Sequence, residues 1–164
     1  MELNPTRGWK AAGALLAAYL LPVAGITLAA PDEPWDAFPA DCQRGSNCTR
    51  GADRSVRGEG VAPVGVAAAR DNVQAALLEW LEEQPRTRIL NSQEGFVHAV
   101  QRTVFFRFPD DFTFRLACEG DETVIQVQSQ SRLGVSDFGV NEKRVRDFYE
   151  DFDATALAPG NCAG

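Results

Sequence analysis

This chain of 164 residues has little of what metal sites and hydrolytic sites usually require. It contains one histidine, His98, and its cysteines lack the Cys-x-x-Cys spacing of zinc ribbons. It also has no Gly-x-Ser-x-Gly nucleophile elbow and no Ser-x-x-Lys motif that could replace the histidine of a serine hydrolase. We therefore expect no metal and no cofactor, and we interpret His98 as a satisfied strand residue.

Basic residues are also scarce. The chain after residue 31 carries 14 Lys and Arg residues against 22 Asp and Glu residues, a net charge of −8. Such a surface repels the phosphate backbone of nucleic acids and offers no polybasic patch for anionic lipids. The composition therefore argues against nucleic acid as a partner.

Charged residues are absent from Ala11 to Pro31, a run long enough for a helix to cross the roughly 30 Å hydrocarbon core of a membrane. Two basic residues precede this run and three acidic residues follow it: Arg7, Lys10, Asp32, Glu33 and Asp36. Because basic flanks stay in the cytoplasm, we predict a cytoplasmic N-terminus at residues 1–10, a transmembrane anchor at residues 11–30 and an extracytoplasmic C-terminal domain. The alternatives are a signal peptide cleaved near Ala30, which would give a secreted protein, and a buried core helix.

Four cysteines follow the apolar run, as expected for two disulfides in an oxidising compartment. Four cysteines allow three connectivities, and spacing alone does not select one. The short loop between Cys42 and Cys48 favours a local bond, which leaves Cys118 to pair with Cys162 near the C-terminus.

The composition of the chain changes at about residue 60. Residues 31–60 are rich in proline and glycine and contain two cysteines, which is typical of a loop-rich linker. Residues 61–164 hold nearly all of the apolar periodicity after the anchor and are long enough for one domain.

Apolar spacing predicts the elements of that domain. It indicates helices at Ala67–Glu82, which Pro85 ends, and at Asn141–Phe152, with Asn141 as the N-cap. Runs rich in Val, Ile, Phe and Thr predict four neighbouring antiparallel strands: Thr87–Ser92, Gly95–Phe105, Phe112–Glu119 and Thr123–Ser131. The expected fold class is α+β, with a curved antiparallel sheet of about four to five strands and two helices packed on one face.

The densest group of polar side chains lies where the last predicted strand meets the last predicted helix. Its candidate ligand-binding residues are Ser129, Ser131, Arg132, Ser136, Asp137 and Asn141. In one interpretation they stabilise the loop, with Arg132 paired to Asp137 and Asn141 capping the helix. In the other, Arg132, Ser136 and the amides at the helix start bind a carboxylate, a phosphate or a sugar acid.

Two further candidates, Asp110 and Asp111, follow Pro109 between phenylalanine-rich strands, a composition that is normal for a turn. The pair could instead join Arg132 in a site, act as acid and base, or bind calcium. A series of aromatic residues surrounds it: Phe105, Phe106, Phe108, Phe112 and Phe114. These rings are expected in the core and on the sheet surface, or alternatively in an apolar ligand groove between the sheet and a helix.

The chain resembles a known family, domain of unknown function 1499, in three blocks. Residues 128–144 are similar to its signature Arg-Ser-x-Ser-Arg-x-Gly-x-Ser-Asp-x-Gly-x-Asn-x-x-Arg, although Gln128 stands where the family often has arginine. Residues 106–114 resemble its Phe-x-Phe-x-Asp-Asp segment, and Cys42 to Cys48 resembles its upstream cysteine pair. The resemblance spans about residues 42–152. It implies the fold and an envelope location, and no mechanism, because the family has no established activity.

These observations favour a membrane-anchored or exported domain that binds rather than catalyses. The expected partners are the membrane, through the N-terminal helix, and a small anionic or lipidic ligand or an envelope protein. The alternative function is a hydrolase or transferase of the cell envelope that uses Asp110, Asp111 or Asp137 together with an arginine.

Overall fold

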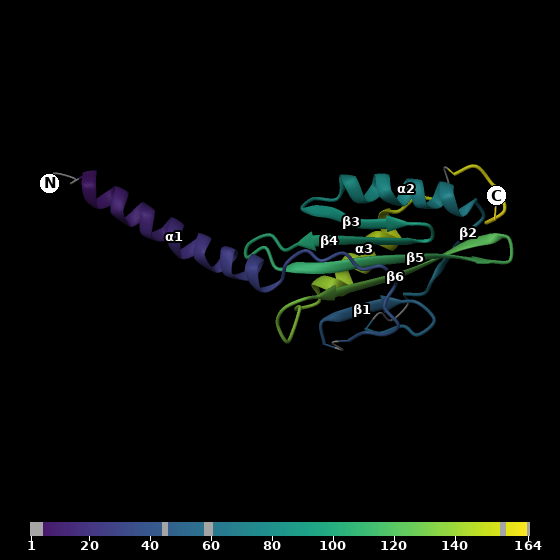
Figure 1. The fold of residues 1–164 in the computed structure, drawn as a ribbon, viewed down its shortest axis with the longest axis horizontal. Coiled ribbons are helices and arrows are strands. Elements are labelled where there is room, and N and C mark those ends of the chain that lie inside the picture. Colours follow the sequence, from purple (N-terminus) through teal and green to yellow (C-terminus); the bar gives the residue numbers. More distant parts are fainter. Residues whose placement is uncertain (1–4, 44–45, 58–60, 155–156, 164) are drawn as a thin grey trace.

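The computed structural model comprises a long N-terminal helix followed by an α+β domain (Figure 1). It describes residues 5–43, 46–57, 61–154 and 157–163. Parts of three predicted segments lie outside the described residues: residues 1–4 of the cytoplasmic N-terminus, residues 44–45 and 58–60 of the linker, and residues 155–156 and 164 of the domain. The helices in the described part of the chain are α1 (Pro5–Ala29), α2 (Arg70–Glu83) and α3 (Val140–Asp151).

An antiparallel sheet of six strands forms the body of the domain. The strands are β1 (Cys48–Gly51), β2 (Val64–Val66), β3 (Thr87–Gln93), β4 (Phe96–Arg102), β5 (Pro109–Glu119) and β6 (Glu122–Ser131). Strands β6, β5, β4 and β3 are consecutive neighbours, and β1 and β2 both pair with the other edge of β6. The α+β class and the four predicted strands are confirmed. The short strands β1 and β2 were not predicted, because three or four residues are too few to establish an alternating pattern.

Helices α2 and α3 pack on the same face of the sheet, as predicted. The ring centroid of Phe148 in α3 lies 5.2 Å from that of Trp80 in α2, and 6.4 Å and 5.0 Å from those of Phe112 and Phe114 in β5. Complete burial of one phenylalanine side chain stabilises a fold by about 3 kcal/mol. This aromatic cluster therefore contributes strongly to holding both helices on the sheet.

The opposite face of the sheet is polar and is covered by residues 30–43, which we call the strap. The strap follows α1 and runs across the strands before the chain enters β1 (Figure 1). The indole of Trp35 stacks on the imidazole of His98 with a centroid distance of 4.8 Å. The guanidinium of Arg50 lies 4.7 Å from the centre of the Phe38 ring. The strap thereby shields buried polar side chains of the sheet from water.

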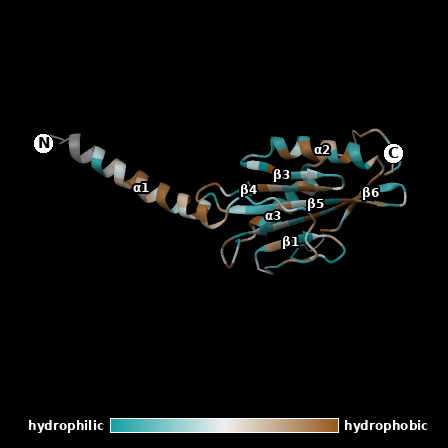
Figure 2. Ribbon diagram, in the orientation of Figure 1, coloured by the Kyte–Doolittle hydropathy of each residue, from teal (hydrophilic) through white to brown (hydrophobic). Residues whose placement is uncertain are grey.

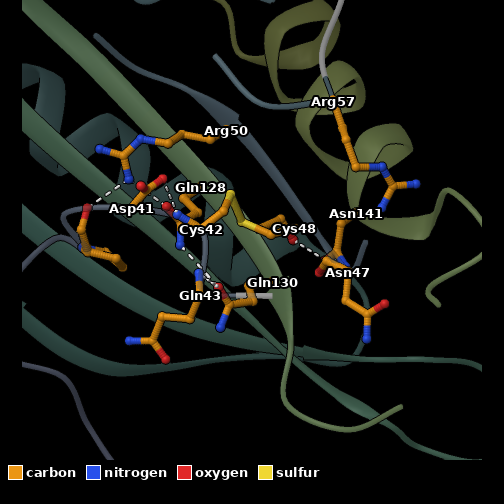
Figure 3. Close-up of a disulfide and its surroundings, with 12 residues drawn as sticks. Asp41, Cys42, Gln43, Asn47, Cys48, Arg50, Arg57, Gln128, Gln130 and Asn141 are labelled. Atoms are coloured by element: carbon orange, nitrogen blue, oxygen red, sulfur yellow. Dashed lines mark hydrogen bonds between the residues drawn. A yellow bond between two sulfur atoms is a disulfide. The ribbon is translucent and has the colours of Figure 1, made fainter. Parts of the chain in front are cut away.

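Two disulfides confirm the predicted pairing. Cys42 at the end of the strap is bonded to Cys48 in β1, and Figure 3 shows this bond beside Gln130 of β6. Cys118 in β5 is bonded to Cys162, 44 residues later. The first bond fixes the strap to the edge of the sheet, and the second holds the C-terminal segment against β5.

Three element boundaries differ from the prediction by three residues, and one of them is the start of strand β5 at Pro109 instead of Phe112. Helix α2 begins at Arg70, three residues later than predicted, because Ala69 has extended backbone angles, φ −60° and ψ 136°. Strand β4 ends at Arg102, three residues earlier than predicted. The Thr103 amide donates to the Phe108 carbonyl at 3.0 Å, so the chain turns instead of continuing the strand.

Helix α1 contains a candidate membrane span, Ala12–Ala29, with a mean hydropathy of 1.9. Figure 2 shows hydrophobic colouring along most of this helix. None of the span is buried against the domain, so the interpretation as a buried core helix is wrong. The length and composition of the span fit a membrane anchor and equally a signal sequence.

Candidate functional site

Asp110 and Asp111 lie in strand β5 and not in the predicted turn. Asp110 is paired with Ser131 of β6, and Asp111 is paired with Gln130. Because successive side chains of a strand point to opposite faces of the sheet, the two carboxylates separate. Asp110 points to the face covered by α3, and Asp111 points to the face covered by the strap. The predicted site residues are therefore divided between two clusters.

The helix-face cluster lies between the sheet and α3. It comprises Asp110, Ser129, Ser131, Asn141 and Arg144, all of them buried. Arg144 donates to Asp110 Oδ2 at 2.8 Å, and to Ser129 Oγ and Asn141 Oδ1 at 2.7 Å each. Asn141 Nδ2 in turn donates to Ser131 Oγ at 2.9 Å. These mutual hydrogen bonds satisfy the buried polar groups and fasten α3 to the sheet.

Asp137, and not Asn141, caps helix α3. Its Oδ2 accepts the Asn141 amide at 3.0 Å, and its Oδ1 accepts the Gly139 amide at 3.2 Å and Arg57 Nη1 at 3.1 Å. Burial opposes ionisation of Asp137, but these hydrogen bonds outweigh it and lower its pKa. The N-cap position itself is Gly139, whose φ of +80° favours glycine. The predicted pairing of Asp137 with Arg132 is wrong, and the two amides proposed to bind an external anion already bind Asp137.

The strap-face cluster lies between the sheet and the strap. It comprises Asp32, Arg88, His98, Arg102, Asp111 and Arg132. Arg132 Nε lies 3.0 Å from both carboxylate oxygens of Asp111, and its Nη2 lies 2.6 Å from Oδ1. Arg132 Nη1 also reaches Asp32 at 3.1 Å, and Arg102 Nη2 lies 2.9 Å from both Asp32 oxygens. Arg88 forms a further ion pair with Asp32. The cluster therefore ties the chain just beyond α1 to the ends of β4 and β6.

His98 is a buried partner of Asp111, with 2.7 Å between Nε2 and Oδ1. The Trp35 amide donates to His98 Nδ1 at 2.9 Å, so the ring proton lies on Nε2 and is donated to Asp111. Both ring nitrogens are thus engaged, and the side chain is fully buried. This arrangement agrees with the predicted role of a satisfied strand residue and leaves no nitrogen free to act as a base.

The opposite charges in the strap-face cluster stabilise the ionised forms of Asp32 and Arg132. Burial opposes ionisation of Asp32, but the hydrogen bond from Arg102 and the charges of Arg102, Arg88 and Arg132 outweigh it and lower the pKa of Asp32. Burial likewise disfavours the charged form of Arg132, but Asp111 and Asp32 raise its pKa overall. Both partners of the Asp32–Arg132 pair are therefore charged at neutral pH.

Position 128 is a glutamine where arginine would be expected from the resemblance, but the neighbouring strand places a guanidinium group beside it. Arg50 in β1 lies directly opposite Gln128 in the β1–β6 register and donates to its Oε1 at 2.5 Å. Arg50 Nη1 also donates to the carbonyl of Pro39 in the strap at 2.7 Å. A positive charge is therefore present on the strap-covered face of the sheet even though residue 128 is a glutamine (Figure 3).

A cavity of about 240 Å³ lies under the strap. Its lining includes Asp111, Gln130 and Arg132 of the sheet side, and Pro31 and Trp35 of the strap. Among the described residues, no group of three or more His, Cys, Asp or Glu side chains is arranged to hold a metal ion. The cavity is thus a polar space next to ion-paired side chains.

A larger groove of about 450 Å³ lies at the end of the sheet nearest α1. Two loops form it: residues 103–108 between β4 and β5, and residues 132–139 between β6 and α3. The apolar lining residues are Val104, Phe105, Phe106, Phe108, Leu133, Phe138 and Val140. The polar ones are Thr103, Asp110, Ser131, Ser136 and Asp137. The predicted alternative was an apolar groove between the sheet and a helix, whereas this groove lies between two loops. Phe105, Phe106 and Phe108 line it, and Phe112 and Phe114 are buried in the core.

The predicted ligand-binding residues take three kinds of position. Those that line the groove are Asp110, Ser131, Ser136 and Asp137. Asp111 and Arg132 line the cavity under the strap, and Ser129 and Asn141 lie only in the helix-face cluster. Sequence reasoning missed Asp32, Trp35 and Arg144. Arg144 could have been found because it lies one helical turn after Asn141, whereas no local signal links Asp32 or Trp35 to the sheet.

The fold and the two disulfides define a disulfide-bonded α+β domain that follows an apolar N-terminal helix. This organisation is compatible with an anchored or exported protein. The family described as "Protein of unknown function (DUF1499)" matches residues 40–152, and the chain belongs to this family. No curated protein and no solved structure matches the chain.

Proposed function

We propose that this protein is a single-pass membrane protein whose extracytoplasmic domain binds a lipidic ligand in the groove between its two apolar loops. The composition of the groove carries this proposal. Its volume of about 450 Å³ suits one acyl chain or a similar small ligand, and most of its lining is apolar. Asp110 and Ser131 contribute a few polar atoms to its lining, and an apolar lining with a few polar groups is the usual composition of a small-molecule site.

The proposed extracytoplasmic location of the domain rests on the charges near the N-terminus and on the disulfides. Basic residues precede the apolar span and acidic residues follow it, which favours a cytoplasmic N-terminus. The bonds Cys42–Cys48 and Cys118–Cys162 form and persist in oxidising compartments. Both features support an anchored domain on the extracytoplasmic side.

A binding role has more support than the alternative of a hydrolase or transferase. Asp110 is engaged by Arg144, Asp111 by Arg132 and His98, and Asp137 by the amides of α3. Asp110 and Asp111 also lie on opposite faces of the sheet. Asp110 and Asp137 both line the groove, but each is already held by the hydrogen bonds just named. A pair of carboxylates that work as acid and base must instead reach one substrate from a shared site.

The amount of lipid that co-purifies with the protein tests this function. The full chain is purified in mild detergent, and bound lipid is measured by native mass spectrometry. Val140→Trp places an indole in the groove at the first position of α3, and Ala75→Trp places one on the exposed face of α2 as the matched control. We expect bound lipid with the wild type and with Ala75→Trp, and its loss with Val140→Trp. Equal lipid on all three proteins, or none on any, would reject the groove as the site.

A further inference from the structure

We infer that the two loops around the groove insert into the outer leaflet of the membrane that α1 crosses. This inference rests on the anchor of the proposed function and is independent of any ligand in the groove. The exposed apolar side chains of these loops are Val104 at 63%, Phe105 at 75%, Phe106 at 52%, Val135 at 89% and Phe138 at 94% of their full exposure. Large apolar side chains concentrated in this way mark an interaction surface rather than ordinary protein surface.

Helix α1 places these loops at the membrane. Tyr19 Oη donates to the Phe105 carbonyl at 2.9 Å. Tyr19 lies within the candidate span, ten residues before Ala29, which is about 15 Å along a helix axis. The tip of the 103–108 loop therefore lies beside the part of α1 that would be surrounded by lipid (Figure 1).

Asp32 keeps both loops in this orientation. It lies three residues beyond the end of α1 and binds Arg102 and Arg132. Arg102 immediately precedes the first loop, and Arg132 is the first residue of the second. The two loop bases are therefore held against the membrane end of the chain by one carboxylate.

Several backbone groups of the 103–108 loop are satisfied within the protein, which lowers the cost of placing them in an apolar environment. The Thr103 amide donates to the Phe108 carbonyl, and the Phe108 amide donates to Thr103 Oγ1, both at 3.0 Å. Tyr19 satisfies the carbonyl of Phe105 at the tip.

Photocrosslinking of the full chain in phosphatidylcholine vesicles tests the insertion. Val135→p-benzoylphenylalanine places the probe on a loop tip that does not line the groove. Asp121→p-benzoylphenylalanine, in the exposed turn between β5 and β6 at the far end of the domain, is the matched control (Figure 1). We expect lipid adducts at position 135 and none above background at position 121. Equal yields at both positions, or adducts at 135 only with a second copy of the protein, would overturn the inference.

A second variant separates insertion from groove binding. Val140→Trp is combined with the probe at position 135. Adducts that persist when the groove is filled come from the bilayer and support insertion, whatever the outcome of the lipid co-purification test. Adducts that vanish with Val140→Trp come from a groove ligand, and they would overturn insertion while leaving the proposed function intact.

Discussion

The carboxylates of Asp110 and Asp111 are adjacent in sequence but bind different arginines on opposite faces of the sheet. Asp110 accepts a hydrogen bond from Arg144 of α3, and Asp111 accepts from Arg132 at the end of β6. One short segment of β5 therefore fastens both layers that cover the sheet, with α3 on one face and the strap on the other. Asp110 and Asp111 are therefore two separate attachments and not one paired site.

Double-mutant cycles test this separation. We expect Asp110→Asn and Arg144→Met to couple by about 2 kcal/mol, because the two side chains are in contact, and Asp110→Asn and Arg132→Met to couple by less than about 0.5 kcal/mol. The free energies of unfolding come from denaturant titration of the full chain. Strong coupling of Asp110 with Arg132 would show that the two carboxylates share one site.

The buried Asp110–Arg144 pair should contribute far more to stability than an exposed pair on the same helix. Arg144→Met leaves a buried carboxylate without its cation, and we expect a loss of about 3–5 kcal/mol. Arg146→Met breaks the exposed pair with Glu142, for which we expect about 0.5 kcal/mol or less. Denaturant midpoints of the two variants measure the difference. Comparable losses for both variants would contradict the central role of Arg144.

The two disulfides should differ in their effect on stability. Replacement of Cys118 and Cys162 by serine opens the longer loop, and the chain-entropy relation gives a loss of about 4 kcal/mol. The same change at Cys42 and Cys48 opens a loop with a separation of only 6 residues, for which about 2 kcal/mol is expected. Guanidinium unfolding of the two double variants measures both values, and a larger loss for the shorter loop would contradict the loop-entropy account.

The attachment of the strap should weaken in acid through Asp32. Its folded-state pKa lies below the ordinary value of 3.8, so its contribution is complete above that value and is lost as the pH falls through the lower folded-state pKa. The stability difference between the wild type and Asp32→Asn should therefore be constant near neutral pH and shrink in this acidic range. A difference that grows as the pH falls would have the wrong sign for this ion pair.

The sequence was sufficient for the parts of the fold that depend on local pattern. Alternation in β5 and β6 and the helical spacing of Val145 and Phe148 predicted the sheet and the helix that covers it. The strap could not be predicted, because its attachment depends on single contacts such as Asp32 with Arg102, between residues 70 positions apart. Loop-rich composition indicated a linker there and carried no information about the face of the sheet that it covers.

The sequence identified several residues of the candidate site, but it did not predict how their side chains are arranged in space. Proline followed by two aspartates is typical of a turn, but pairing with Ser131 and Gln130 keeps both aspartates in a strand and sends their side chains apart. Asn141 has a side chain suited to an N-cap, yet Asp137 reaches the free amides first, and Asn141 is drawn into the buried network of Arg144. Tertiary contacts decided between local alternatives that the sequence left equally reasonable.

Titration of the full chain with a fluorescent fatty acid tests the groove most directly. Because the groove lining is apolar, we expect saturable binding to the wild type and to Ala75→Trp. Val140→Trp should weaken binding by at least about tenfold, which corresponds to 1.4 kcal/mol. Equal affinity for all three proteins, or no saturable binding to the wild type, would contradict the proposal that this domain binds an apolar chain between its two loops.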